Sequence, residues 1–197
     1  ECTREFARID QLIERIYPTL ALQAGAVSPL GVSHAGAPGV IEVDARQFEA
    51  VLNQLVRNAC DAVHNGGSVV IETESIAIER KYLASRPALS PGHYVALRVI
   101  DTGIGIPSDA YDHIFEPFFS TKPLHSNSGL GLAACSAIIR QCGGAIEVNS
   151  RVGVGTTVTV YWPRAFEPAR PVLPSEEHPT PKTNAATILL VEDENAL

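Results

Sequence analysis

The sequence contains no methionine, not even at position 1, so we interpret it as a piece of a longer protein. Cations are scarce as well: 15 Lys and Arg stand against 22 Asp and Glu, for a formal net charge of -7. This balance argues against a nucleic-acid binder, because proteins hold phosphate backbones with clustered Lys and Arg. A single nucleotide pocket needs only local positive potential, so the charge does not exclude one.

Long apolar runs and paired cysteines are also missing. No run reaches the roughly 18 residues of a membrane-spanning helix, and no signal peptide is present, so we expect no direct membrane contact and a cytoplasmic location. The cysteines form no CxxC pair and lie near no histidine cluster, which argues against a zinc site. We expect buried or half-buried thiols, as suits a reducing compartment. They are Cys2, Cys60, Cys135 and Cys142.

Hydrophobic periodicity and turn residues divide the chain into helices and strands. Helices are expected over 5–24, 45–64 and 129–142. Strands are expected as a short pair within 29–44, then over 68–80 and 93–101, and as a final pair that meets through 150–155 and ends at Trp162-Pro163. The segment between 107 and 128 is irregular and polar, with aromatic insertions.

The composition changes after residue 164. Five prolines fall between Ala165 and Ala186, which predicts a semi-rigid linker. The apolar run 187–191 then predicts a buried strand, and Glu192-Asp193-Glu194 follows it. We therefore expect three parts: a domain over 1–164, a linker over 165–186, and the beginning of a second domain over 187–197.

A polar stripe lies on the helix expected over 45–64, which Asp44 precedes as a capping residue. Its members fall in a sector about 60° wide that borders the apolar face. They are Gln54, Asn58, Asp61 and Asn65. Amide and carboxylate oxygens at the margin of a buried face could line a pocket and bind Mg²⁺. The alternative is a solvated helix flank.

A carboxylate lies at the end of the strand expected over 93–101. Asp101 ends the strand, and Gly103 and Gly105 let the backbone turn and approach a ligand closely. A carboxylate in this place can accept a hydrogen bond from the exocyclic amine of adenine, whereas guanine offers a carbonyl there. The alternative is an Asx turn that merely ends the strand.

Two glycines open the last expected helix. Free N–H groups and the positive end of the helix dipole bind phosphate at such a place. Gly129-x-Gly131-x-x-Ala134 formally matches a dinucleotide fingerprint, but no strand precedes it and no ribose-binding acid follows about 20 residues on. A GxxxxGK[ST] motif is absent, so this is not a P-loop protein.

Five segments in this order resemble the N, G1, F, G2 and G3 boxes of histidine-kinase catalytic domains. They are Asn58-Ala-Cys-Asp61-Ala, Asp101-x-Gly103-x-Gly105-Ile-Pro, Ile114-Phe-Glu-Pro-Phe-Phe-Ser-Thr-Lys122, Gly129-Leu-Gly-Leu132 and Gly153-Val-Gly155-Thr-Thr. The resemblance covers roughly 1–164 and implies an α+β fold. This is the Bergerat fold, a two-layer sandwich of a mixed, mostly antiparallel sheet with helices on one face and a mobile ATP lid over 107–128.

The resemblance also implies the cofactors and their residues. Asn58 would coordinate Mg²⁺ bridging the phosphates of ATP, and Lys122 would reach the phosphates from the lid; both would be catalytic. Asp101 would bond the adenine amine. The other nucleotide-binding residues would be Asp61, Gly103, Gly105, Ile106, Gly129, Leu130, Gly131, Leu132 and Thr156. Phe115, Phe118 and Phe119 match the aromatic lid box, with core packing as the alternative.

The sequence departs from the family at two places. Gln54 stands where these kinases commonly have Asn, with Asn53 one place earlier, and where the hydrolysing relatives have a Glu that activates water. Gln cannot serve as a general base, so this departure favours a kinase over an ATPase. The glycine box begins with Asn127-Ser128 instead of the usual Gly-Thr, so lid contacts can differ.

The partners follow from what the resemblance implies and from what is missing. None of the six histidines, at 34, 64, 93, 113, 125 and 178, stands in an acceptor motif. The acceptor would lie on an upstream dimerisation and phosphotransfer domain of a homodimeric parent. Residues 188–194 resemble the first strand of a receiver domain, with Glu192 and Asp193 in its acidic pocket, which predicts a hybrid kinase. A binding-only pseudokinase and an ATPase of the same fold are the alternatives.

Overall fold

A computed structural model describes residues 3–25, 29–36, 39–63, 66–80, 89–120 and 129–166 of the chain. These residues belong to a unit that spans Glu1–Glu167. Apart from Ala165 and Phe166, the predicted linker and receiver strand lie outside the described residues, and the boundaries at 164 and 186 stay predictions. No helix of the described part is long and apolar enough to cross a membrane.

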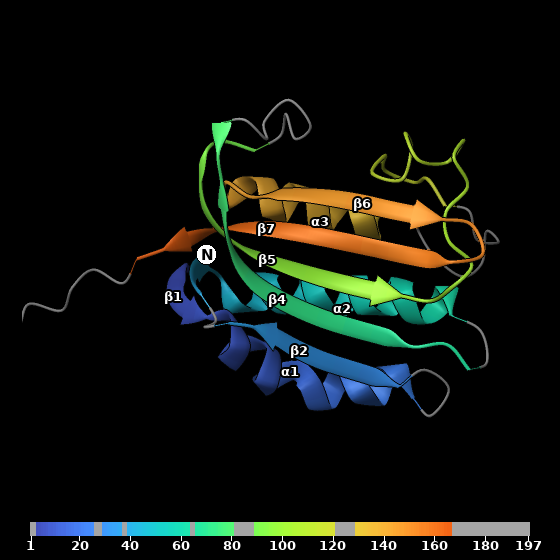
Figure 1. The fold of residues 1–197 in the computed structure, drawn as a ribbon, viewed down its shortest axis with the longest axis horizontal. Coiled ribbons are helices and arrows are strands. Elements are labelled where there is room, and N and C mark those ends of the chain that lie inside the picture. The colour runs from blue at the N-terminus through green and yellow to red at the C-terminus, as the bar shows by residue number, and fades with distance from the viewer. Residues whose placement is uncertain are drawn as a thin grey trace, which may run out of the picture. The chain divides into compact units, whose positions relative to one another are not determined.

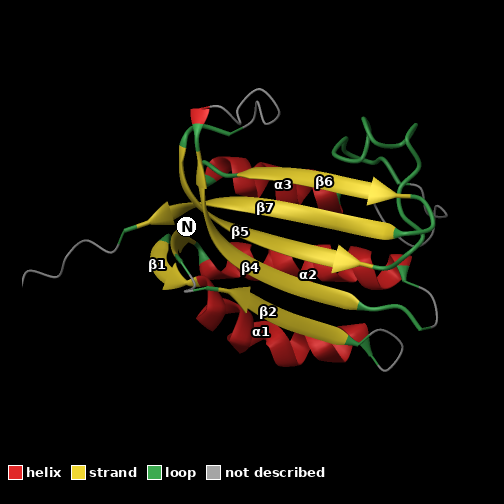
Figure 2. Cartoon of the chain, viewed as in Figure 1, coloured by secondary structure: helices red, strands yellow, loops and turns green. Residues whose placement is uncertain are grey.

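In the described part of the chain, three helices cover one face of a seven-stranded sheet (Figures 1 and 2). The helices are α1 (Ile9–Ala24), α2 (Ala45–Ala62) and α3 (Gly131–Gln141). The strands are β1 (Glu5–Arg8), β2 (Leu30–Ala35), β3 (Val40–Val43), β4 (Val69–Ile78), β5 (Gly92–Asp101), β6 (Ala145–Arg151) and β7 (Gly155–Ala165). Their order is β1-β3-β7-β5-β4-β2, with β6 also paired to β7. Only the β2–β4 pairing is parallel among the described strands. The predicted α+β sandwich is confirmed.

The first helix begins later than the sequence predicts. Residues Glu5–Arg8 form β1, which pairs antiparallel with β3, and Phe6 is 49% exposed instead of packing in the core. The helix expected from residue 5 is therefore wrong over these four residues, because pairing with a strand distant in sequence overrides a local apolar pattern. The short strands expected within 29–44 are confirmed as β2 and β3, but they pair with different neighbours.

Helix α2 is held at its start and along its length. The Asp44 side chain caps it, because Oδ1 accepts hydrogen bonds from the N–H groups of Arg46 (2.8 Å) and Gln47 (3.3 Å). Its apolar face is buried, and the Phe48 ring lies 6.1 Å from that of Trp162 on β7. This packing fixes the rotation of α2 and so fixes where its polar stripe lies.

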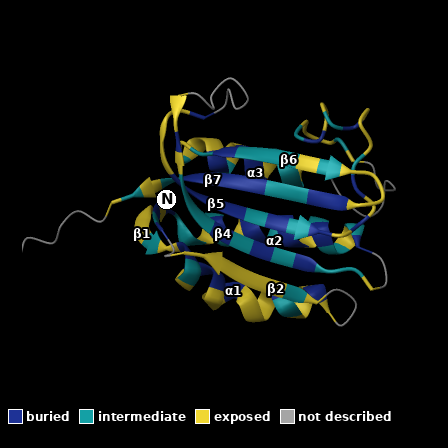
Figure 3. Cartoon of the chain, viewed as in Figure 1, coloured by how far each residue is buried: buried dark blue, intermediate teal, exposed yellow. Residues whose placement is uncertain are grey.

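Alternation along β5 determines where Asp101 points. Val95, Leu97 and Val99 are buried in the main core between the sheet and the helices, and Asp101 continues the same two-residue period. The alternate positions Tyr94 and Ala96 belong to a smaller cluster together with Tyr161. Figure 3 shows the buried central strands and the exposed edge strand β2. The Asp101 carboxylate is therefore carried to the helix side of the sheet.

The three described cysteines are free thiols, as expected. Cys135 is buried, and burial raises the pKa of its thiol to about 12. Cys60 and Cys142 are half-buried. Cys2 lies outside the described residues.

Candidate nucleotide-binding site

Asp101 is bound by the backbone on one side only. It is 6% exposed, and its Oδ1 accepts hydrogen bonds from the N–H groups of Gly103 (2.8 Å) and Thr156 (3.2 Å). The Asx turn proposed as the alternative is therefore present. No described residue donates a hydrogen bond to Oδ2, and that oxygen is not sealed from solvent. The turn and a ligand acceptor are thus compatible, because each uses a different oxygen.

Burial removes water from the Asp101 carboxylate, so a hydrogen-bond donor from a ligand would stabilise it. Loss of hydration raises the pKa of Asp101, and the N–H groups of Gly103 and Thr156 oppose the rise. An amine placed at Oδ2 would restore part of the lost solvation. The site therefore favours a ligand that offers an N–H group at this point.

The two glycines after Asp101 let the loop run against other backbone. A Cβ on Gly103 would lie 2.4 Å from the Ala62 carbonyl oxygen at the end of α2. Gly105 has φ +73, and a Cβ there would lie 2.3 Å from the carbonyl oxygen of Arg151. The Ile104 N–H donates to that same Ala62 oxygen at 3.0 Å. These glycines are needed for close packing within the protein, and their approach to a nucleotide base stays a prediction.

Ser150 is a residue that the sequence reasoning missed. Its Oγ accepts a hydrogen bond from the Ile106 N–H (2.8 Å) and donates one to the Gly155 carbonyl (3.0 Å). It also lies 2.8 Å from the Thr156 hydroxyl oxygen. Ser150 thus joins the loop after β5 to the turn between β6 and β7. It stands outside every recognised motif, so the pattern gave no signal for it.

The polar stripe of α2 lies at the margin of the core, as predicted. Gln54 and Asn58 are half-buried and Asp61 is exposed, while Asn65 lies outside the described residues. The Gln54 Nε2 donates to Asn58 Oδ1 at 2.9 Å. Asn53 instead donates to the carbonyl of Glu49 on its own helix at 2.9 Å, so it does not replace the missing family amide.

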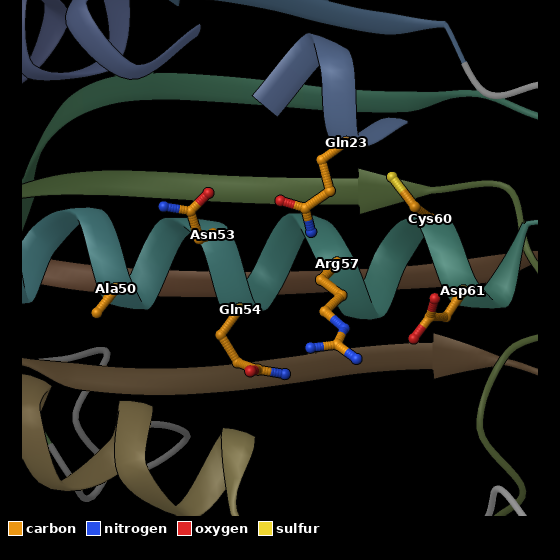
Figure 4. A pocket seen from close by; sticks show the side chains of 7 residues that line it. All are labelled: Gln23, Ala50, Asn53, Gln54, Arg57, Cys60 and Asp61. Carbon is orange, nitrogen blue, oxygen red and sulfur yellow. The ribbon is translucent and has the colours of Figure 1, made fainter. Parts of the chain in front are cut away.

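An open groove of about 510 Å³ runs along the solvent side of α2 (Figure 4). It is lined by Gln23, Ala50, Asn53, Gln54, Arg57, Cys60 and Asp61. Two of these, Gln54 and Asp61, belong to the predicted stripe. Arg57 was missed, although it follows Gln54 by three residues and precedes Asp61 by four, the spacing of helical neighbours. It places a cation in this groove.

The beginning of the predicted lid is packed on the domain. The Tyr111 hydroxyl donates to the Val148 carbonyl of β6 at 2.7 Å, and Ala110 and Ile114 are buried. The remainder of the lid, residues 121–128, lies outside the described residues and includes Lys122, Asn127 and Ser128. The roles predicted for Lys122 and for lid movement stay predictions.

The two flanks of that undescribed segment meet at the backbone. The Phe118 N–H donates to the Gly129 carbonyl at 3.0 Å, and both residues have positive φ, +70 and +66. Phe118 is 76% exposed, so core packing is the wrong interpretation for it, whereas Phe115 and Phe119 are half-buried. Just beyond Gly129, α3 begins at Gly131, with Leu130 exposed and Leu132 packed against the core.

The structure therefore brings together the loop after β5, the end of α2 and the turn between β6 and β7. The end of β5 meets the end of α2 through Ile104, and the β6–β7 turn meets the same loop through Gly153, whose N–H donates to the Ile104 carbonyl at 2.8 Å.

The sequence model of the family described as "Histidine kinase-, DNA gyrase B-, and HSP90-like ATPase" matches residues 43–165, more than half of the chain. The chain belongs to this family.

Similar proteins include sensor kinases. Sensor kinase CckA of Brucella abortus (strain 2308) is 39% identical over 185 residues, which cover 90% of this chain and 20% of that protein. Sensor histidine kinase ZraS of Escherichia coli (strain K12) is 34% identical over 123 residues, covering 62% of this chain and 23% of that protein. The chain thus spans about a fifth of the length of these relatives.

Solved structures agree on the fold. The catalytic domain of histidine kinase ThkA superposes with a TM-score of 0.65 at 25% identity, covering 83% of this chain and 96% of that one. Full-length ShkA in complex with AMPPNP gives a TM-score of 0.64 at 24% identity, covering 84% of this chain and 32% of that one. In histidine kinases, the domain of this family is the ATP-binding catalytic part.

Proposed function

We propose that this chain supplies the kinase activity of a sensor histidine kinase, passing the γ-phosphoryl group of Mg·ATP to a histidine on a separate dimerisation domain. The proposal rests on the Asp101 carboxylate, of which only one oxygen is hydrogen-bonded within the described residues. Backbone N–H groups bind Oδ1, and no described residue donates to Oδ2. The exocyclic amine of adenine is the donor that fits Oδ2. The sensor-kinase names of the relatives support the assignment.

The phosphates would lie between α2 and the start of α3. There the N–H groups around Gly129 and Gly131, together with Lys122, would hold them. No group of three or more His, Cys, Asp and Glu side chains among the described residues could form a cage for a metal. The donor set fits Mg²⁺ instead, because this ion is commonly held by one or two protein oxygens plus phosphates and water. Asn58 Oδ1 would be that oxygen, and the bound ion would neutralise charge on the phosphates.

Gln54 favours transfer over hydrolysis. An amide cannot take a proton from water, and the Gln54 Nε2 is engaged with Asn58. Phosphoryl transfer depends on positioning and charge neutralisation, so without an acceptor the bound ATP should persist. This argument separates the proposal from the ATPase alternative, and a transfer experiment separates it from a binding-only domain.

The wider architecture is part of the same proposal. An upstream dimerisation domain would supply the acceptor histidine in a homodimeric, cytoplasmic kinase portion, and a receiver domain would begin at 187. The alignment with a sensor kinase covers 90% of this chain, more than residues 1–164 alone would give, so it extends past the predicted catalytic domain.

The transfer experiment uses γ-labelled ATP and Mg²⁺. The chain alone should bind ATP, take up no label and release little phosphate. Adding the dimerisation helices of the parent protein, in cis or in trans, should place acid-labile phosphate on a histidine of those helices. Steady phosphate release at about one per second, within the ordinary enzyme range, would move the chain to the ATPase class. Binding without transfer in the presence of the helices would favour a binding-only domain.

Replacing the proposed Mg²⁺ ligand should uncouple the metal from the nucleotide. In Asn58→Ala, magnesium should no longer tighten ADP binding, while the affinity for ADP without magnesium should stay close to wild type because Asp101 is untouched. Calorimetric titration of ADP with and without Mg²⁺ measures both affinities. Asn53→Ala is the matched control, since Asn53 bonds only its own helix. An Asn58→Ala variant with the full magnesium effect would remove the metal role from Asn58.

A further inference from the structure

Gln54 lies between two parts of the proposed phosphate site. On one side its Nε2 donates to Asn58 Oδ1 at 2.9 Å, one helical turn along α2. On the other side its carboxamide lies against Gly131, the first residue of α3, and points from α2 toward α3 (Figure 4). Both neighbours are residues that the proposed function uses, whereas Gln54 itself departs from the family pattern.

The hydrogen bond to Asn58 leaves that residue able to bind a cation. A carbonyl-type oxygen has two lone pairs, so Oδ1 can accept from Gln54 and still direct the other pair at a metal. With the Gln54 amide in this orientation, a reversed Asn58 would turn its NH₂ group toward the NH₂ group of Gln54, so the bond favours Oδ1 as the Asn58 atom that faces the cation. Hydrogen bonds of this kind orient metal ligands, and removing them typically weakens metal affinity about 10–100-fold.

Gly131 provides the space that Gln54 occupies. A Cβ on Gly131 would lie 2.4 Å from Gln54 Nε2 and 2.5 Å from its Cδ. A methyl group there would meet the end of a flexible side chain, so the carboxamide would have to move while the backbone could stay in place. The position of the Gln54 amide is therefore coupled to the absence of a side chain at the start of α3.

Resting on the proposed function, we propose that Gln54 is a positioning residue that orients Asn58 Oδ1 toward the phosphate-bound cation, and that Gly131 is required because it leaves room for this carboxamide. The ligand is a divalent cation carried by a nucleoside diphosphate or triphosphate. This assigns a role to the amide that distinguishes the chain from its kinase relatives.

The first test measures the magnesium effect, defined as the ratio of the ADP dissociation constants without and with Mg²⁺ at constant ionic strength. Gln54→Met keeps the length of the side chain and removes the donor. Its magnesium effect should fall about 10-fold or more, with the magnesium-free affinity within about twofold of wild type. Asn53→Ala, the neighbouring amide that bonds Glu49, should keep the full effect.

The second test displaces the carboxamide without deleting it. Gly131→Ala should lower the magnesium effect as Gln54→Met does. The magnesium effect of the double variant should be no smaller than that of the more affected single variant, because both changes remove the same interaction between Gln54 and Asn58. Additive losses would mean that Gly131 acts through its own N–H group and would overturn its assigned role.

Other outcomes separate this inference from the proposed function. A full magnesium effect in Gln54→Met, with the effect lost in Asn58→Ala, would overturn the inference and leave the proposed function standing. Loss of magnesium-free ADP binding in Gln54→Met would also overturn it, because Gln54 would then shape the whole pocket. Absence of ADP binding in the wild type would instead remove the proposed function itself.

Discussion

Asp101→Asn should weaken ATP binding by about 2 kcal/mol or more, roughly 30-fold, which is typical for a hydrogen bond to a charged group. The amide can keep Oδ1 as acceptor for the N–H groups of Gly103 and Thr156. It then presents an NH₂ group where the carboxylate presented Oδ2, and two donors would face each other at the adenine amine. Calorimetric affinity within twofold of wild type would show that Asp101 does not contact the base.

The same substitution should leave the free energy of unfolding unchanged or increase it. The pKa of Asp101 is raised by burial, so ionisation of this group costs stability that a neutral amide does not lose. The advantage should be full above the raised pKa and vanish below the ordinary value of 3.8, where the carboxyl is protonated in the folded and unfolded states alike. Urea unfolding of both proteins at neutral and acid pH measures it.

Asp101→Ala is the control for this separation of binding from stability. It removes the acceptor as well as the charge, leaving two buried N–H groups without a partner, which costs about 1–3 kcal/mol each when no water replaces it. Both variants should lose ATP binding, but only the alanine variant should unfold earlier in urea. Equal destabilisation by Asn and Ala would contradict the arrangement of Oδ1 and Oδ2 described above.

Gly155→Ala should produce the largest loss of stability among the glycines of the site. Gly155 has φ +135, and a Cβ there would lie 1.9 Å from the carbonyl oxygen of Asp101. This contact is with backbone, so the start of β7 has to move away from the end of β5 and the Thr156 N–H from Asp101 Oδ1. We expect the free energy of unfolding to fall by about 4 kcal/mol or more, above the usual range for one substitution, with ATP binding lost.

Gly153→Ala in the same turn is the matched control. Gly153 also has a positive φ, +76, but no atom lies within 4 Å of a Cβ built there. Only the backbone strain remains, about 1–2 kcal/mol, and the N–H group that bonds Ile104 is kept. Urea unfolding of the two variants side by side tests the difference. Similar losses would show that strain at positive φ, and not the contact with Asp101, governs this turn.

The sequence by itself determined the features that depend on neighbours along the chain. The apolar period of α2, its Asp44 cap and the placement of Asp101 at a strand end were predicted correctly, because helix rotation, capping and strand alternation are local properties. The five motifs in order also indicated the family. The same local reasoning was wrong for Glu5–Arg8, where pairing with β3 prevails.

Tertiary structure alone decided the contacts between distant segments. The second hydrogen bond to Asp101 Oδ1 comes from Thr156, 55 residues away, and the anchoring of Ile106 depends on Ser150. The contact between Gln54 and Gly131 arises only when α2 and α3 pack together. Periodicity states which side of an element a residue occupies, but not what the fold brings opposite it. The chemical environment of a predicted site residue is therefore decided by packing.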